Sequence, residues 1–319
     1  MKKLLALVLV AGLLAGLWFI QGWKARGPAP HAVTLVVPKG ASLASTATLL
    51  QKAGAISSRR RFLVQARLFG GGGVIEAGEY EIPAHASNAQ ILNLLEGGKA
   101  LQRMVTIPEG MPSILVQERL AAAPGLAGDA PLPDEGSVLP NSYSYQRGET
   151  RGAVLARMQA AMTKTLEALW PKRSPDAVVQ SKEEALTLAS IVEKETAKPS
   201  ERAMVAGVYS NRLKQGMALG ADPTVIYPIT RGKPLGRRIL QSELHAVNGY
   251  NTYSKRGLPI GPIANPGKES IVAVLHPAET QALYFVADGT GGHVFANTLA
   301  EHNANVKKWF DIRRARGEM

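Results

Sequence analysis

Residues 185–196 contain two glutamates whose spacing could place them in different environments. On a helix with about 100° between residues, Glu195 lies on the same stripe as Leu188 and Val192. Glu193 lies roughly 160° away from Glu195 and faces outward. A carboxyl group on an apolar stripe is costly to ionise, so its pKa rises toward neutrality, as a general acid at physiological pH requires. Glu195 is therefore the candidate proton donor. A helix that ended before Glu195 would instead leave both acids in solvent.

The sequence offers no comparable metal or cofactor site. Four histidines, His245, His276, His293 and His302, lack the close spacing of a zinc motif such as H-E-x-x-H. The chain has no cysteine, which excludes a disulfide framework, a cysteine nucleophile and thiolate metal ligands. We therefore expect chemistry that needs no metal and no cofactor.

The N-terminus predicts a membrane anchor. Lys2 and Lys3 precede a stretch from Leu4 to Trp23 without a charged residue, which is long enough for a hydrocarbon core that needs about 20 apolar residues. Bulky residues occupy the place of a signal-peptide cleavage site, so residues 1–26 are expected to stay as a cytoplasmic tip and transmembrane helix instead of being removed. The two lysines favour a cytoplasmic N-terminus and export of the remainder.

The overall charge favours an anionic partner. Lys and Arg number 37 against 25 for Asp and Glu, which gives a net charge of +12. This charge suits an anionic polymer or an anionic membrane surface. Nucleic acid is not expected, because the basic residues are spread along the chain and no helix-turn-helix or zinc-finger pattern is present.

A small folded module is predicted over residues 31–100. The pattern predicts, in order, a strand over 31–37, helices over 43–53 and 57–68, a strand over 78–82 and a helix over 89–95. The strand-helix-helix-strand order resembles the LysM-type modules that hold glycan chains. Glycan binding and simple support of the next domain are both open for this module.

The remaining chain is predicted as a connecting segment followed by a catalytic domain of α+β class. Residues 101–150 contain a strand, a helix over 113–122 and a stretch rich in Ala, Gly and Pro. Residues 151–319 begin with amphipathic helices over 151–170, 182–197 and 201–216. Strands and turns punctuated by glycine are expected from there to about Ala287.

The segment around Glu195 resembles a known enzyme family. Ala189-Ser-Ile-Val-Glu-Lys-Glu-Thr196 is similar to the signature of the membrane-bound endolytic murein transglycosylases, in which a hydroxyl residue follows the catalytic glutamate. The resemblance covers most of the chain after Gln180. Further blocks match in the family's order: Ser200-Glu-Arg202, Asn211-Arg-Leu213, Ala221-Asp-Pro-Thr-Val-Ile-Tyr227, Tyr250-Asn-Thr-Tyr253, Gly257-Leu-Pro259, Gly261-Pro-Ile263, Asn265-Pro-Gly267, Leu275-His-Pro277, Tyr284-Phe-Val-Ala-Asp288 and Gly291-Gly-His293.

The resemblance implies a lytic transglycosylase, which is a carbon-oxygen lyase that acts on peptidoglycan. Such an enzyme cleaves the β-1,4 bond between N-acetylmuramic acid and N-acetylglucosamine while the C6 hydroxyl of the muramic acid attacks, leaving a 1,6-anhydro end. One glutamate protonates the leaving oxygen and then accepts the proton of the attacking hydroxyl, so the second carboxylate of ordinary glycosidases is not required. The resemblance also implies an inner-membrane protein with a periplasmic catalytic domain, termination of strand elongation, and cell-wall synthases as partners.

Eight further residues are candidates for binding the glycan. Asp222 precedes a proline and could instead shape a turn, and the tyrosines offer ring faces to sugars but could also fill a core. Asn211 could hold an acetamido group, whereas Glu201 and Arg202 are expected to form a structural ion-pair network. The eight candidates are Thr196, Asn211, Asp222, Thr224, Tyr227, Tyr250, Asn251 and Tyr253.

One position departs from the family's pattern. Asn141 stands where the family commonly has an aspartate, whereas Glu135, Pro140 and Tyr143 match. The role of Asn141 is therefore open.

Two other functions are open besides the transglycosylase. A non-catalytic scaffold of the cell-wall machinery could bind glycan through residues 31–100. The intact pair Glu195-Thr196 argues against this function. A muramidase would use water, with Asp222 assisting, and would release a reducing sugar end.

Overall fold

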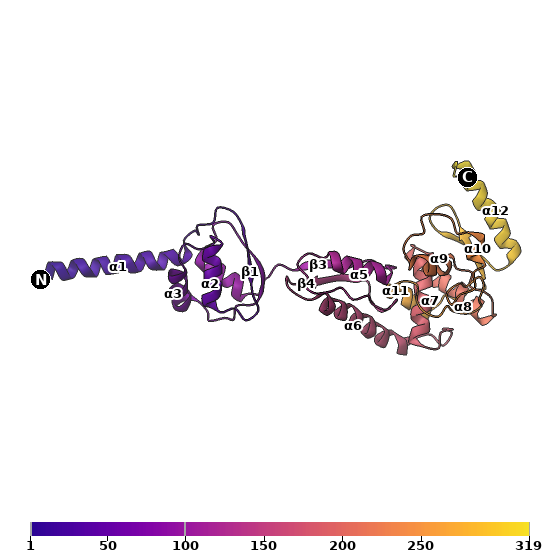
Figure 1. Ribbon diagram of the computed structural model, residues 1–319, viewed down its shortest axis with the longest axis horizontal. Helices are drawn as coiled ribbons and strands as arrows, with labels where there is room; N and C mark the ends of the chain where they lie inside the picture. The colour runs from indigo at the N-terminus through magenta and orange to yellow at the C-terminus, as the bar shows by residue number, and fades with distance from the viewer. Residues whose placement is uncertain (1, 99, 319) are drawn as a thin grey trace. The chain divides into compact units, whose positions relative to one another are not determined.

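The computed structural model of the chain (Figure 1) describes residues 2–98 and 100–318, with side chains described at residues 10, 12 and 14 and from residue 16 onward. The chain forms two compact units. Unit 1 comprises residues 1–104, 124–126 and 144–149, and unit 2 comprises residues 105–123, 127–143 and 150–319. Most of the segment expected to connect two domains thus clusters with the C-terminal part of the chain.

Helix α1 (Lys2–Lys24) begins unit 1. The last turns of α1 pack on the rest of that unit, where Trp23 is buried and the Gln65 side chain donates a hydrogen bond to the carbonyl oxygen of Phe19 at 2.8 Å. Within the described residues, no helix is long and apolar enough to cross a bilayer. The predicted membrane segment from Leu4 to Trp23 lies partly outside the residues whose side chains are described.

The predicted order of strand, helix, helix and strand is confirmed in unit 1. Strand β1 (Val33–Val37) pairs antiparallel with β2 (Gly78–Ile82), and helices α2 (Leu43–Lys52) and α3 (Arg59–Phe69) lie between them in the sequence. Helix α4 (Asn88–Glu96) follows. A serine caps the start of each of the three helices by accepting a hydrogen bond from a backbone N–H of the first turn.

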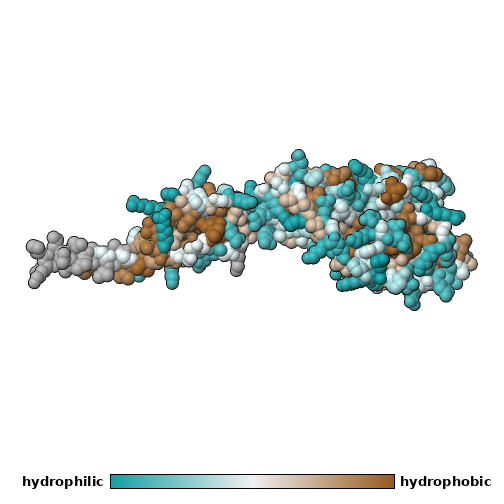
Figure 2. All heavy atoms as spheres, turned by 90° about the horizontal axis from the view of Figure 1, so that it is seen from below, coloured by the Kyte–Doolittle hydropathy of each residue, from teal (hydrophilic) through white to brown (hydrophobic). Residues whose placement is uncertain are grey.

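The core of unit 1 lies between the small sheet and the helices. Tyr80 and Ile82 from β2 and Phe62 from α3 are completely buried. Alternation along β1 buries Leu35 and Val37 and exposes the residue between them. Hydrophobic side chains also gather on the surface of this unit (Figure 2).

Two strands and two helices precede the segment predicted to carry the chemistry. Strand β3 (Arg103–Ile107) pairs with β4 (Asn141–Tyr145) in a second two-stranded sheet, and α5 (Ser113–Ala122) lies between them in the sequence. Helix α6 (Arg151–Leu169) follows and ends in the 3-10 turn η1 (Trp170–Lys172).

The C-terminal part of unit 2 is a cluster of helices with one small sheet. Helix α7 (Lys182–Glu195) packs against α8 (Arg202–Lys214), α9 (Asp222–Thr230) and α11 (Lys268–Leu275). The predicted α+β class is confirmed, and the described part of the chain is mostly helical. The remaining elements are η2 (Pro199–Glu201), α10 (Gln241–Leu244), the antiparallel strands β5 (Tyr284–Ala287) and β6 (His293–Ala296), and α12 (Leu299–Ala315).

The chain after residue 216 is more helical than the sequence predicts. Three helices, α9 to α11, lie where strands and turns are expected. Asp222, for which a turn before Pro223 was one open alternative, is the first residue of α9. A proline is tolerated in the first turn of a helix because the N–H that it lacks has no helical partner there. The Asp-Pro pair therefore marks the start of a helix.

Candidate active site

Helix α7 extends to Glu195, as predicted. Ser181 caps its start by accepting a hydrogen bond from the backbone N–H of Glu184 at 3.1 Å. Thr196 then leaves the helical conformation, with φ −135° and ψ 129°. The side chain of Glu195 is half-buried, while Val192 in the same turn of the helix is completely buried. Glu195 thus ends a helix whose start is capped by Ser181 and whose middle is buried in the core.

The surroundings of Glu195 favour the protonated form of its carboxyl group. Burial raises the pKa of Glu195 to about 7, a hydrogen bond from Tyr209 lowers it, the negative charge of Asp222 raises it, and the positive charge of Arg212 lowers it. Burial dominates because removing a carboxylate from water costs more than the single phenol hydrogen bond returns. A carboxyl group with this pKa can both donate and accept a proton near neutral pH.

Tyr209 is the partner of Glu195 that the sequence analysis does not identify. Its side chain is 2% exposed and packs edge-on against Phe285, with ring centroids 5.8 Å apart. Burial and the neighbouring Glu195 raise the pKa of Tyr209 well above its usual value, so the phenol keeps its proton and donates it to the hydrogen bond. Tyr209 follows Val205 by four residues on α8, and this helical spacing is the signal that could have placed it on a buried face.

A second carboxylate, Asp222, lies close enough to Glu195 to influence it. Asp222 is exposed at the start of α9 and accepts a hydrogen bond from the hydroxyl group of Tyr253 at 2.6 Å. Burial, this hydrogen bond and the charges of Asp222 and Glu195 all raise the pKa of Tyr253. Asp222 and Tyr253 are therefore the two predicted binding residues that share an electrostatic environment with Glu195.

Thr196 holds the turn that follows Glu195. Its hydroxyl group donates to Glu201 at 3.3 Å and accepts from the backbone N–H of Lys198 at 3.1 Å. Glu201 in turn lies 2.7 Å from the ring nitrogen Nδ1 of His293. Thr196 is 3% exposed, so its contacts fix the backbone beside Glu195.

Tyr227 and Tyr250 form an aromatic pair with a third carboxyl group. Their ring centroids are 4.7 Å apart, and the hydroxyl group of Tyr227 donates to Glu135 at 3.1 Å. Burial raises the pKa of Glu135, although hydrogen bonds from Ser113 and Tyr227 oppose the shift. The pair therefore combines half-buried ring faces with a half-buried carboxyl group.

Three other predicted binding residues are occupied by contacts within the protein. The side-chain amide of Asn211 donates to the carbonyl oxygens of Thr280 and Ala282 at 2.8 and 3.1 Å. Asn251 is 1% exposed, and its amide donates to three backbone carbonyl oxygens between residues 243 and 246. The completely buried hydroxyl group of Thr224 bonds the carbonyl oxygen of Ala221. These polar groups hold loops around the site.

Glu193 does not face solvent, in contrast to the prediction. Its carboxylate is 5% exposed and pairs with Arg202 at 3.3 Å. It also accepts hydrogen bonds from the backbone N–H of Gly267 at 2.9 Å and from the hydroxyl group of Ser270 at 2.8 Å. The start of α11 covers this side of α7, and a helix N-terminus stabilises a carboxylate. Glu201 and Arg202 were expected to form an ion-pair network, but their partners differ from that prediction: Arg202 pairs with Glu109 and Glu193, whereas Glu201 contacts Lys198 and His293.

Asn141 is engaged locally, and His293 contributes to the site through its contact with Glu201. The side chain of Asn141 is exposed and accepts a hydrogen bond from the backbone N–H of Ser142 at 2.7 Å. Among the described residues, no three His, Asp or Glu side chains are arranged to hold a metal ion.

Comparisons with known proteins agree on one family over most of the chain. Residues 35–308 match the profile described as the YceG-like family. An endolytic murein transglycosylase from Bacillus subtilis is 28% identical over 313 residues, which cover 88% of this chain and 86% of the relative. An endolytic murein transglycosylase from Streptococcus pneumoniae is 29% identical over 324 residues, which cover 86% of this chain and 58% of that relative.

One solved structure extends the comparison to the fold. A crystal structure of a yceG-like protein from Listeria monocytogenes superimposes with a TM-score of 0.55 at 26% identity. The match covers 86% of this chain and 98% of the other.

Proposed function

This chain belongs to the YceG-like family, and on that premise we propose that it is an endolytic lytic transglycosylase of peptidoglycan. It cleaves the bond from N-acetylmuramic acid to N-acetylglucosamine within nascent strands and leaves 1,6-anhydro ends. The observation that carries the proposal is the carboxyl group of Glu195 at the end of α7, with its pKa raised to about 7.

The proton of Glu195 moves twice in the proposed reaction. Glu195 first donates its proton to the glycosidic oxygen, which leaves as the hydroxyl group of N-acetylglucosamine. The C6 hydroxyl oxygen of the muramic acid bonds to C1 of the same sugar, and its proton passes to the carboxylate of Glu195. The carboxyl group is thereby restored, and no water is consumed. A pKa near neutrality suits both steps, because donating the proton and accepting it back then have similar free-energy costs at neutral pH.

Tyr209 and Asp222 support this cycle in opposite ways. The hydrogen bond from Tyr209 fixes the orientation of the carboxyl group and stabilises its ionised form. The negative charge of Asp222 stabilises the protonated form. Tyr209 is therefore a positioning residue, and Asp222 with Tyr253 forms a polar edge that a sugar can contact.

A muramidase is the second candidate, because one observation favours it. Asp222 is a second carboxylate within electrostatic range of Glu195, and two carboxylates are what a hydrolysing glycosidase uses. Its acceptor contact with Tyr253 favours a fixed position over a role as a base. A non-catalytic scaffold is less well supported, because it does not explain the raised pKa of Glu195, a property typical of catalytic acids.

The remaining parts of the chain are proposed to place this reaction at the membrane. Residues 1–26 anchor the chain in the inner membrane with the N-terminus in the cytoplasm, and the LysM-like module over residues 31–100 holds glycan. Residues 101–150 connect this module to the catalytic domain over residues 151–319, which lies in the periplasm. Cleavage there terminates elongation of strands delivered by cell-wall synthases.

The test of the proposal compares wild type with Glu195→Gln. The full chain in detergent micelles is incubated with uncrosslinked glycan strands, and the products are separated by length. We expect internal cleavage by wild type and a loss of about 10³-fold or more in rate for the variant. Comparable cleavage by both proteins would refute the assignment of Glu195.

A further inference from the structure

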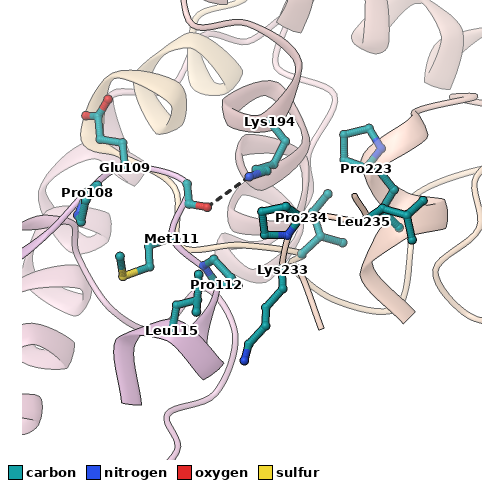
Figure 3. A pocket seen from close by; sticks show the side chains of 14 residues that line it. Pro108, Glu109, Met111, Pro112, Leu115, Lys194, Pro223, Lys233, Pro234 and Leu235 are labelled. Atoms are coloured by element: carbon teal, nitrogen blue, oxygen red, sulfur yellow. Dashed lines mark hydrogen bonds between the residues drawn. The ribbon is translucent and has the colours of Figure 1, made fainter. Parts of the chain in front are cut away.

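A cavity of about 450 Å³ lies in unit 2 between α5, α7 and α9 (Figure 3). This volume is within the usual range for sites that bind small organic ligands. Its walls are mainly apolar and include Met111, Pro112, Leu115 and Ile226. Lys194 reaches the cavity from the end of α7 (Figure 3).

The cavity is built from the same two helices as the candidate active site. Lys194 directly precedes Glu195 on α7, and Pro223 directly follows Asp222 on α9. Helices α7 and α9 pack against each other. A ligand in the cavity is therefore held on the elements that carry the two carboxyl groups.

The turn that forms one wall of the cavity is fixed. Asn265 is completely buried. Its side-chain amide donates to the backbone carbonyl oxygen of Met111 at 2.9 Å, and its backbone carbonyl oxygen accepts from the N–H of Gly110 at 2.9 Å. Gly232 lies against this turn, where a Cβ atom would lie 2.6 Å from Cβ of Pro112. The cavity is thus present before any ligand binds.

Lys194 supplies the cavity with a positive charge. Lys194 is exposed, and within the described part of the chain its ammonium group has one hydrogen-bond partner, the carbonyl oxygen of Gly110 at 3.5 Å, which leaves donors free. No carboxylate among the described residues pairs with Lys194. Of the two neighbouring acids, Glu118 pairs with Lys233 at 2.6 Å, whereas Glu109 shares Arg202 with Glu193, at 2.7 and 3.3 Å.

We infer that this cavity binds the short peptide that peptidoglycan carries on its muramic acid, an inference that rests on the proposed function. That peptide is rich in alanine and carries free carboxylates, so its methyl groups match the apolar wall and a carboxylate matches the ammonium group of Lys194. The peptide leaves the muramic acid at its lactyl group, next to the bond that is cleaved. Binding it beside Glu195 positions that bond and makes the peptide-bearing strand the preferred substrate.

The first experiment measures binding without cleavage. A free muramyl peptide is titrated calorimetrically into the full chain in detergent micelles, using wild type, Lys194→Gln, Leu115→Trp and the control Lys307→Gln on the exposed surface of α12. We expect Lys194→Gln to raise the dissociation constant about tenfold, because the substitution removes a charge-assisted hydrogen bond to the ligand. The indole of Leu115→Trp should fill the cavity and abolish binding, and the control should match wild type. No binding by wild type, or equal binding by all four proteins, would overturn the inference.

The second experiment compares strands that retain their peptides with strands from which an amidase has removed them. We expect Lys194→Gln to lower kcat/KM about tenfold on peptide-bearing strands only. An equal loss on both kinds of strand would mean that Lys194 acts on Glu195 and would contradict peptide binding. Failure of wild type to cleave either strand would refute the proposed function, whereas the titration decides the binding inference independently.

Discussion

The buried phenol of Tyr209 donates a hydrogen bond to the carboxyl group of Glu195 at the end of α7. The two residues come from neighbouring helices that pack against each other, so the orientation of the acid depends on the packing of α8. Because the contact stabilises the ionised carboxylate, it opposes the effect of burial on the pKa of Glu195.

Tyr209→Phe should raise the pKa of Glu195 further, since this substitution removes that hydrogen bond and keeps the ring. The alkaline limb of the profile of kcat/KM against pH should move to higher pH, and kcat should fall about tenfold because the carboxyl group is less well oriented. Tyr143→Phe is the matched control, because the hydroxyl group of Tyr143 donates to the carbonyl oxygen of Leu139 at 2.6 Å, away from the acid. If the alkaline limb of the pH profile were unchanged in Tyr209→Phe, the phenol of Tyr209 would not influence the pKa of Glu195.

Asp222→Asn should shift the same limb in the opposite direction. The substitution removes the negative charge that raises the pKa of Glu195, while an amide oxygen can still accept the hydrogen bond from Tyr253. The alkaline limb should therefore move to lower pH, with kcat at acidic pH nearly unchanged. A loss of cleavage of about 10²-fold at every pH would instead identify Asp222 as a base and favour the muramidase.

The stability of the fold should depend on pH through Glu195. Its pKa is raised from 4.5 to about 7, so between these values the native state binds more protons than the unfolded state. The free energy of unfolding should fall as pH rises through this window. The stabilising contribution of protonated Glu195 is fully present below the window. Glu195→Gln lacks the titrating group, so its Tm should decrease less than that of wild type between pH 4.5 and 7. Parallel Tm profiles of the two proteins would contradict the raised pKa.

Arg202→Met should destabilise unit 2 by about 3–5 kcal/mol, because it leaves the carboxylate of Glu193 buried without its cation. Both side chains are less than one tenth exposed. The double variant Arg202→Met/Glu193→Gln should recover part of the loss, which chemical denaturation would measure. If the single and double variants were equally stable, the ion pair would not be the cause.

The sequence predicts most helices with visible start signals. Ser42 and Ser181 lie at the starts of helices that the structure contains, because a hydroxyl side chain satisfies a free N–H there. Helix α9 was not predicted, since Asp222-Pro is typical of a turn as well as of a helix start. Its hydrophobic residues pack against α7, and that contact does not exist in the local sequence.

The candidate site was predictable only where the argument stayed within one helix. The apolar stripe of α7 predicts a raised pKa for Glu195, and the structure agrees with that prediction. The same reasoning placed Glu193 in solvent, because the sequence does not reveal that Arg202 and α11 cover the other side. Tyr209 needed the packing of two helices, and Asn211 is engaged by carbonyl oxygens of a loop about 70 residues away.

The chemistry of the new strand end tests the central claim most directly. Wild type is incubated with uncrosslinked strands in water enriched in heavy oxygen, and the products are analysed by mass spectrometry. We predict 1,6-anhydro ends that contain no heavy oxygen, because the sugar's own C6 hydroxyl group attacks and Glu195 only shuttles its proton. Reducing ends that carry heavy oxygen would show that water is the nucleophile and would contradict the account.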